Sequence, residues 1–257
     1  MIKKRLQEFL SPLQVTFYRV MVMNRRPILI IGDIHGYFTV LDAFIKRFEP
    51  QLVLQCGDFG IWPGRNVERL ASGFKTEAGQ VVPIHFCDGN HENHPKLRKL
   101  CESAMANLEV GEGVFYQPRG SLITLPNGHV VLFAGGACSV DKDMRTPGQD
   151  WFPEEILTEN DFAHFPDIPS VDIVISHAAP ASLKLPPLLD VEKYYDPSRD
   201  VLDKVLQRYR PKQWFCAHYH IAFSSKIKNC RIQALDCGHS HKWKDEINKD
   251  GYAVYEI

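Results

Sequence analysis

The stretch PILIIGDIHG, residues 27–36, joins an apolar run to a polar ending. Its Ile and Leu residues are bounded by Pro27 and stop at Gly32, which is typical of a short strand buried on both faces. Asp33 and His35 follow at once, and side chains two positions apart in an extended chain point to the same side. The stretch therefore predicts a buried strand whose carboxyl end carries a pair of ligand-type side chains.

The segments that follow repeat this order of strand, loop and helix. Residues 37–48 place phenylalanine, leucine and isoleucine at helical spacing. Further strand-like runs occupy 51–58 and 81–90, and a helical pattern follows at 94–105. Strands that alternate with helices are typical of a layered α/β fold.

The second half of the chain mixes hairpins with further strand and helix patterns. Short alternating strands surround a Pro-Asn-Gly turn, which is a strong hairpin signal. The expected elements are a hairpin at 113–136, helices at 153–165 and 197–209, strands at 171–177 and 213–218, and C-terminal hairpin strands at 221–238 and 251–257. We expect one domain, residues 27–257, of two sheets packed face to face with helices outside. An extension at 1–26 precedes it, in which Met21 or Met23 is an alternative start.

Composition and charge exclude several classes of protein. The 257 residues are 44% hydrophobic and 24% charged with a formal net charge of −1, so we expect no membrane association and no large basic surface for nucleic acid. No apolar run approaches the roughly 18 residues that span a bilayer. Seven cysteines without a CxxC pair favour the reducing cytoplasm, and we expect Cys56, Cys87 and Cys216 to be small buried thiols.

Polar motifs stand at the ends of the predicted strands: GDIHG, GDFG, GNHE, SHAAP and AHYH. Ligand and catalytic groups of layered α/β folds gather where strands end and loops begin. The flanking glycines let the backbone turn sharply and leave space for a ligand. The candidate metal ligands in these motifs are Asp33, His35, Asp58, Asn90, His177, His218 and His220.

The candidate ligands are carboxylates, imidazoles and one amide, a set that suits Mn²⁺, Fe or Zn²⁺ better than Ca²⁺ or Mg²⁺. They outnumber the ligands of one tetrahedral ion. We therefore predict two divalent ions that share a bridging aspartate, with Mn²⁺ as the first choice. Two ions about 3.5–4 Å apart clamp a phosphate and turn a bridging water into hydroxide near neutral pH.

The order GDxHG, GD, GNHE, SHxxP and HxH resembles that of the calcineurin-like metallophosphoesterases, over residues 27 to about 240. The resemblance implies a four-layer αββα sandwich of two mixed β-sheets flanked by helices, with a dinuclear metal site. It implies that the first ion is held by Asp33, His35 and His220, the second by Asn90, His177 and His218, and that Asp58 bridges them. By the same resemblance His91 is not a ligand. It would face the phosphate, stabilise developing charge and protonate the leaving oxygen.

A second HxH pair, His239 and His241 in GHSH, competes for the last motif. Its glycine matches the family pattern better than Ala217 does. We assign the motif to His218 and His220, because the hairpin that follows them has the expected length and ends in a Gly turn. His239 and His241 would then lie one hairpin later, near the rim of the site.

The chain departs from the Ser/Thr protein phosphatases of the superfamily, which carry GDxxDRG. Here Ile61 and Trp62 stand where the second Asp and the Arg would be, so a protein phosphatase of that type is not expected. In those enzymes that Asp orients the catalytic histidine, so His91 lacks this partner. Glu92 and Asp88 are alternative partners for it.

Phosphate must then meet other cations, and the polar loop at 137–155 offers Lys142 and Arg145. Arg145 could bind a phosphate through two parallel hydrogen bonds. Trp151 or Trp62 could stack on a base. Ordinary surface ion pairs are the alternative for both cations.

We therefore predict a metal-dependent enzyme, a phosphatase or phosphodiesterase, that hydrolyses a phosphate mono- or diester by attack of a metal-bridging hydroxide. The missing protein-phosphatase motif and the aromatic side chains favour a small phosphorylated or nucleotide-type substrate. A non-catalytic interaction scaffold on the same fold and a nuclease of the same superfamily are the alternatives. A scaffold is expected to lose ligands, and a nuclease is expected to carry a basic stripe. The sequence shows neither feature.

Overall fold

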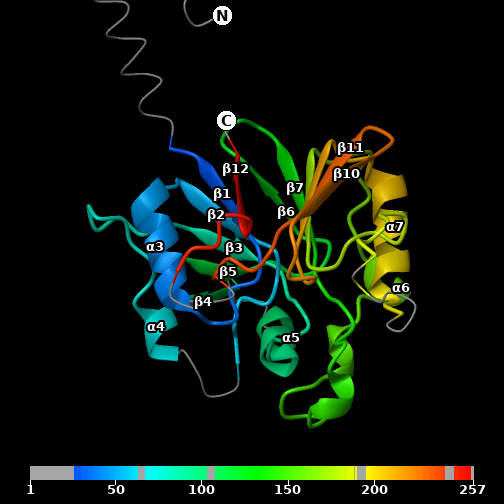
Figure 1. Cartoon of the computed structure of the whole chain (residues 1–257), viewed down its shortest axis with the longest axis horizontal. Coiled ribbons are helices and arrows are strands. Elements are labelled where there is room, and N and C mark those ends of the chain that lie inside the picture. The colour runs from blue at the N-terminus through cyan, green and yellow to red at the C-terminus, as the bar shows by residue number, and fades with distance from the viewer. Residues whose placement is uncertain are drawn as a thin grey trace, which may run out of the picture.

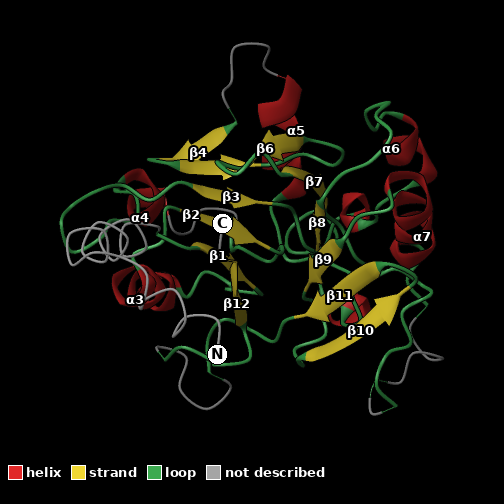
Figure 2. Cartoon of the chain, turned by 90° about the horizontal axis from the view of Figure 1, so that it is seen from above, coloured by secondary structure: helices red, strands yellow, loops and turns green. Residues whose placement is uncertain are grey.

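The computed structural model describes residues 26–62, 67–102, 108–187, 189, 195–240 and 246–255. Within these ranges two β-sheets pack face to face, and helices cover the outer face of each sheet (Figures 1 and 2). The predicted four-layer αββα sandwich is therefore confirmed. The extension predicted at 1–26 lies, apart from Arg26, outside the described residues.

The first sheet has a parallel centre and antiparallel edges. Its order in the described chain is β12-β1-β2-β3-β5-β4, and β1, β2, β3 and β5 run parallel. The strands are β1 Ile28–Ile31, β2 Leu52–Gln55, β3 Ile84–Phe86, β4 Glu109–Gly111, β5 Val114–Tyr116 and β12 Tyr252–Tyr255. Because the parallel strands share one direction, their carboxyl ends meet at one edge of the sheet.

The second sheet repeats this plan. Its order among the described residues is β10-β11-β9-β8-β7-β6, with β11, β9, β8 and β7 parallel and both outer strands antiparallel. The strands are β6 Leu122–Thr124, β7 Val130–Ala134, β8 Ile173–Ser176, β9 Gln213–Cys216, β10 Phe223–Ile227 and β11 Cys230–Ala234. The hairpin predicted around Pro-Asn-Gly is β6–β7.

Strand β1 shows how side-chain alternation builds the layers. Ile28 and Ile30 belong to the apolar cluster between the two sheets, whereas Leu29 and Ile31 belong to the cluster under the helices of the first sheet. All four side chains are fully buried. A strand covered on both faces needs an unbroken apolar run, which is what the sequence has there.

Amphipathic helices close the outer layers. Helix α3, Phe38–Phe48, buries Leu41 and Phe44 against the first sheet and ends at Glu49, whose φ of 41° is left-handed. Helix α7, Ser198–Tyr209, covers the second sheet. The shorter helices are α4 Val67–Ala71, α5 His94–Glu102 and α6 Glu159–Ala163, with 3₁₀ turns at Lys142–Met144 and Pro153–Glu155. No described helix is long and apolar enough to cross a membrane.

Residues 153–165 do not form the single helix that their sequence predicts. A 3₁₀ turn at Pro153–Glu155 ends at Ile156, which is extended, and α6 begins only after Thr158. Thr158 and Asp161 form a capping box, in which each side chain accepts a hydrogen bond from the other's backbone N–H. This local cap starts a new helix, and the break lets the Glu155 side chain turn into the interior.

The C-terminal strand β12 joins the first sheet beside β1, whereas the sequence predicted a hairpin strand there. Ile28 of β1 lies opposite Tyr255 in an antiparallel register. Gly32 N donates to Gly251 O at 2.9 Å, and a Cβ on Gly251 would lie only 2.0 Å from Cys237 O. The glycine permits this close crossing, and β12 covers an edge of β1 that would otherwise be open.

The three cysteines that end apolar runs are interior residues. Cys56, Cys87 and Cys216 are fully buried, as predicted. Burial raises the pKa of each thiol well above its usual range. They therefore act as small apolar side chains of the core.

Candidate metal centre

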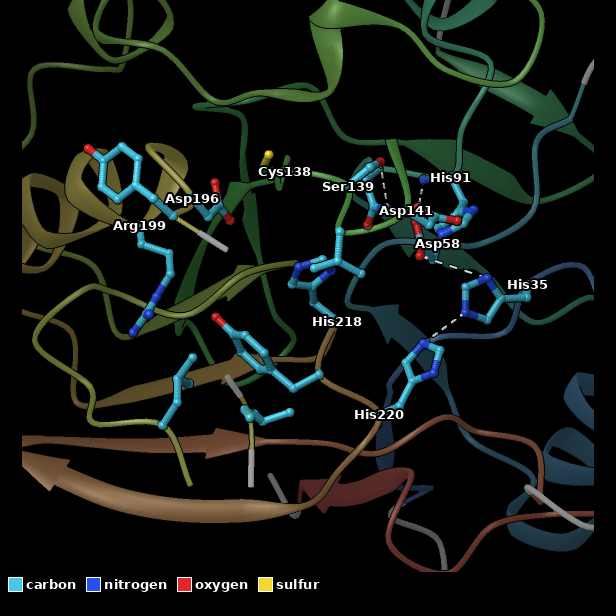
Figure 3. A pocket seen from close by; sticks show the side chains of 16 residues that line it. His35, Asp58, His91, Cys138, Ser139, Asp141, Asp196, Arg199, His218 and His220 are labelled. Atoms are coloured by element: carbon cyan, nitrogen blue, oxygen red, sulfur yellow. Dashed lines mark hydrogen bonds and ion pairs between the residues drawn. The ribbon is translucent and has the colours of Figure 1, made fainter. Parts of the chain in front are cut away.

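The polar motifs meet where the parallel strands of both sheets end. Asp33 follows β1, Asp58 follows β2 and Asn90 follows β3, while His177 and His218 follow β8 and β9. A cavity of about 710 Å³ opens at this point, and side chains from both sheets point into it (Figure 3). Its lining includes His35, Asp58, Asn90, His91, His218 and His220.

Asp33, His35 and His220 form one group of donor atoms, called here the first group. The Nε2 atoms of His35 and His220 lie 3.1 Å apart, and Asp33 Oδ2 lies 2.9 Å from His220 Nε2. Asp33 is fully buried, and its Oδ2 meets the His220 ring without the alignment of a regular hydrogen bond. A buried carboxylate oxygen flanked by two imidazoles is a set of oxygen and nitrogen donors that a divalent ion accepts, so the group fits a metal ion.

His177, Asp58 and Asn90 form the second group. His177 Nε2 lies 3.0 Å from Asn90 Oδ1 and 3.4 Å from Asp58 Oδ2. The other ring nitrogen, Nδ1, lies 2.8 Å from the carbonyl oxygen of Cys56. A proton on Nδ1 donated to that carbonyl leaves the Nε2 lone pair for an ion, which is the usual arrangement of a metal-ligating histidine.

Two aspartates lie between the groups. Asp33 falls with His35 and His220 in one set of ligand-type atoms within 4.8 Å of one another, and with Asp58 and His177 in another. Asp58 Oδ2 is also 3.8 Å from His35 Nδ1. Both carboxylates therefore qualify for the bridging position that the sequence analysis gives to Asp58.

The buried carboxylates at the second group favour a positive charge beside them. Burial alone would lower the pKa of His177, but Asp58 and Asp33 more than offset it and raise that pKa to about 10. Burial would likewise raise the pKa of Asp58, but the charged His177 holds it well below its usual value. The imidazolium thus supplies a positive charge that a divalent ion would replace.

His218 lies against the second group as a neutral imidazole. Its ring centroid is 4.9 Å from that of His177, and its backbone N–H donates to Asp33 Oδ1 at 3.2 Å. Burial first, and then the charge on His177, lower the pKa of His218 to about 3. The neutral ring keeps a lone pair that an ion can use.

The DxH and HxH pairs converge through left-handed turns, whereas the sequence predicted convergence through a strand pleat. Strand β1 ends at Ile31, and His35 has a φ of 48°. His218 and His220 have φ of 70° and 51°, and Asp58 has 53°. Residues other than glycine rarely adopt this conformation, which costs of the order of 1–3 kcal/mol each and clusters at functional sites.

Two glycines make room for the candidate ligands. A Cβ on Gly57, whose φ is 88°, would lie 2.6 Å from His177 Nδ1. A Cβ on Gly89 would lie 2.2 Å from Asp58 Oδ1. The glycines of the GD and GNHE motifs therefore let ligand side chains from other strands approach the backbone.

His91 lies beside the donor atoms without joining either group. Its backbone N–H donates to Asp58 Oδ1 at 2.7 Å, and its ring centroid is 5.2 Å from that of His35. Arg145 places Nη2 at 2.7 Å from His91 Nδ1 and also in contact with Nε2, while it pairs with Asp141 at 2.7 Å. An imidazole and a guanidinium thus stand together next to the candidate metal site.

The two carboxylates considered as partners of His91 are engaged elsewhere. Glu92 accepts hydrogen bonds from the backbone N–H groups of residues 59–61 at 2.6, 3.3 and 2.7 Å, and so fixes the loop after β2. Asp88 is buried and accepts two hydrogen bonds from Arg119, at 2.7 and 3.0 Å. Both residues support the backbone of the site.

The other residues predicted to contact the substrate differ in how close they come to the site. Trp62 Nε1 donates to the carbonyl oxygen of His91 at 2.9 Å, so it holds the backbone of that residue. The Lys142 ammonium lies 4.5 Å from the ring centre of Trp151, and neither Lys142 nor Arg145 is among the described residues that line the cavity. Arg145, through its contact with His91, is the cation of this loop that approaches the site.

His239, the described member of the competing HxH pair, lies next to the first group. The ring of His239 packs edge-on against Tyr37, with centroids 4.7 Å apart, and its centroid is 6.0 Å from that of His35. Among the described residues it belongs to neither set of clustered ligand atoms. His241 lies outside the described residues.

Two residues behind Asn90, Ser139 and Glu155, were not predicted from the sequence. Asn90 Nδ2 donates to Ser139 Oγ at 3.1 Å, and Ser139 Oγ donates to Glu155 Oε2 at 2.7 Å. These contacts aim the Asn90 carbonyl oxygen toward His177. The only sequence signal was the polar loop at 137–155, because the contacts join residues that are far apart in the chain.

We expect Ser139→Ala to weaken binding of the second ion about 10–100-fold, the usual effect of losing a residue that orients a ligand. The Asn90 amide would lose the acceptor that fixes its orientation. Competition with a chelating dye measures the affinity, and the exposed Ser224→Ala serves as control. Equal affinities in the two variants would contradict this role.

Comparison with solved structures finds similar chains of low sequence identity. An archaeal phosphodiesterase has a TM-score of 0.41 and 10% identity, covering 90% of this chain and 99% of its own. The phosphopantetheinyl hydrolase of Mycobacterium tuberculosis has a TM-score of 0.48 and 11% identity, covering 91% and 96%. The NAD nucleotidase of Haemophilus influenzae has a TM-score of 0.37 and 15% identity, covering 90% and 49%. A search of curated proteins found no significant match.

Comparison with protein families gives one assignment. The model of the family Metallophos, calcineurin-like phosphoesterase, matches residues 26–222. That range contains every strand end from Asp33 to His220 at which the candidate ligands lie. The chain belongs to the calcineurin-like phosphoesterase family.

Proposed function

We propose that this family member is a dinuclear metal-dependent phosphoesterase that hydrolyses a phosphate mono- or diester. The observation that supports it most is the convergence of two sets of clustered ligand-type atoms beside one cavity, with an oxygen of Asp33 in both sets. When bound, two divalent ions would neutralise phosphate oxygens and lower the pKa of water enough to supply hydroxide near neutral pH. The proposed holders are Asp33, His35 and His220 for the first ion and Asn90, His177 and His218 for the second, with Asp58 between them.

His91 and Arg145 are the residues that we assign to the substrate. The His91 imidazole, next to the donor atoms but outside them, would give a proton to the leaving oxygen. The Arg145 guanidinium, already against that ring, would bind a phosphate oxygen with charge-assisted hydrogen bonds. Trp62 and Asp58 hold the His91 backbone from two sides, which keeps the imidazole oriented.

The rest of the cavity gives room for an organic leaving group. Beyond the donor atoms its lining includes Val140, Leu185, Leu189, Tyr195, Arg199 and Tyr219. Apolar and aromatic walls beside a few polar groups are typical of small-molecule sites. We therefore infer a small phosphorylated or nucleotide-type substrate. Because the ligand atoms are nitrogen and oxygen, Mn²⁺ is our first choice of metal.

The setting that we propose is the reducing cytoplasm. The seven cysteines all lie within the described residues, and none of them is in a disulfide. A chain with seven cysteines and no disulfide among them suits a reducing compartment.

Metal-free protein supplied with Mn²⁺ tests the proposal. We expect turnover of nitrophenyl phosphate, of its bis-ester, or of both, and we expect a chelator to abolish it and added Mn²⁺ to restore it. The ratio of the two rates decides between monoester and diester preference. Two bound ions without turnover of either ester would favour the non-catalytic scaffold. Cleavage of oligonucleotides faster than of both esters would favour the nuclease.

A further inference from the structure

Cys237 brings a sulfur atom to the first group. Its Sγ lies with an oxygen of Asp33 and ring nitrogens of His35 and His220 in one set, whose atoms are all within 4.8 Å of one another. The residue follows β11 and is fully buried. On the basis of the dinuclear site proposed above, we infer that Cys237 is a thiolate ligand of the ion that Asp33, His35 and His220 hold.

The separations fit one ion. Ligand atoms bound at about 2.0–2.3 Å from a zinc-type ion lie no more than roughly 4.6 Å apart, even on opposite sides of it. The four atoms of this set, within 4.8 Å of one another, can therefore surround an ion after small side-chain shifts. One sulfur, two nitrogens and one oxygen are also donors that Zn²⁺ accepts, and the Asp58 oxygen proposed above as the bridge would be a fifth.

The carboxylate of Asp33 points to a cation at the same place, independently of the cysteine. Its Oδ2 is buried and lies 2.9 Å from the Nε2 atom of His220. The imidazoles of His35 and His220 meet next to it, with their Nε2 atoms 3.1 Å apart. An ion placed among these atoms would satisfy the oxygen and both ring nitrogens together.

Main-chain contacts fix Cys237 beside Asp33. Gly238 N donates to Asp33 O at 2.8 Å, and Cys237 N donates to Asp236 Oδ1 at 2.7 Å. A Cβ on Gly32 would lie 2.1 Å from Asp236 O. The backbone after β1 therefore passes so close to the backbone after β11 that no side chain fits between them. This crossing, which no local sequence pattern predicts, brings the sulfur to the first group.

The other cysteines of the sandwich interior have different surroundings. Cys56 and Cys87 lie in the apolar cluster between the sheets, and Cys216 and Cys230 lie in the cluster under α7. Within the described chain, Cys237 is the cysteine that groups with histidine and aspartate ligand atoms.

A thiolate changes the metal that this position prefers. Soft sulfur favours Zn²⁺, Co²⁺ or Fe over Mn²⁺ and Mg²⁺. Binding forms a sulfur–metal bond in place of the S–H bond and releases the proton to solvent. We therefore expect a thiophilic ion in the first group, whereas the second group, with nitrogen and oxygen donors, also accepts Mn²⁺.

X-ray absorption of the zinc-loaded full-length protein tests the inference directly. We expect a sulfur contribution at about 2.3 Å in the wild type, and its loss in Cys237→Ser. Cys230→Ser, a buried cysteine of β11 in an apolar environment, should keep it. Zinc spectra with nitrogen and oxygen alone in the wild type would overturn the inference, as would a sulfur contribution that persists in Cys237→Ser. The wild-type spectrum decides even if the variant fails to fold.

Metal affinities give a second readout. We expect Cys237→Ser to weaken Zn²⁺ binding at the first group by at least about tenfold, the lower limit for losing even an indirect metal contact. Mn²⁺ binding should change much less, because manganese has little preference for sulfur. Equal losses for both metals would overturn the inference.

The experiments distinguish failure of the Cys237 ligand from failure of the phosphoesterase proposal. A sulfur contribution that depends on Cys237, without hydrolysis of any phosphate ester, would support the ligand and refute the esterase. Metal-dependent hydrolysis with zinc bound by nitrogen and oxygen alone would support the esterase and refute the ligand.

Discussion

Replacing His91 with alanine is expected to lower kcat by about 10²–10⁴-fold, the contribution of a well-placed general acid, while metal content stays unchanged. The reason is its position: its ring is outside both sets of ligand atoms, although its centroid is 5.2 Å from that of His35. Steady-state kinetics and metal analysis of the same preparation check both parts. His164→Ala, an exposed imidazole that contacts the carbonyl oxygen of Asn160, is the matched control.

The leaving group separates proton donation from a general structural effect. If His91 protonates the leaving oxygen, the loss in His91→Ala should be larger for an alkyl ester than for a nitrophenyl ester, whose leaving group needs less help. An equal loss of kcat for both esters would show that His91 does not donate the proton. Wild-type activity in the variant would remove His91 from the mechanism.

Asp58→Asn is expected to lower the binding affinity for both metal ions. The loss should exceed the roughly 100-fold that removing an orienting residue can cause. Its Oδ2 lies 3.4 Å from His177 Nε2 and 3.8 Å from His35 Nδ1, one nitrogen from each group. Asparagine keeps the shape of the side chain and tolerates the φ of 53° at this position. The amide oxygen can also still accept the hydrogen bond from His91 N. Metal content after dialysis against a series of free-metal concentrations measures the effect.

Asp33→Asn is the informative comparison, because Asp33 belongs to both sets of clustered ligand atoms. If Asp58 bridges the ions, the Asp58→Asn variant should bind neither ion well. The Asp33→Asn variant should then lose affinity chiefly for the first ion. The opposite pattern, with Asp58→Asn losing one ion and Asp33→Asn losing both, would move the bridge to Asp33. Circular dichroism shows whether each variant is folded.

The elements that sequence patterns predicted well are those that local periodicity specifies. The apolar run at 28–31 became β1, the helical spacing after it became α3, and the Pro-Asn-Gly turn joined β6 to β7. The errors arose where a more specific contact overrode the pattern. The capping box at Thr158 divided a predicted helix, and the pairing of Ile28 with Tyr255 placed the predicted hairpin strand at the edge of the first sheet.

The sequence by itself determined the α/β layers and the ligand-type side chains at the strand ends, because both follow from short-range periodicity and from the direction of parallel strands. The tertiary structure decided which groups meet. It joined Ser139 and Glu155 to Asn90, turned Glu92 toward a backbone loop, set Arg145 against His91 and brought Cys237 to Asp33. Each of these contacts joins segments distant in the chain, so its distance depends on how the two sheets pack and not on any local pattern.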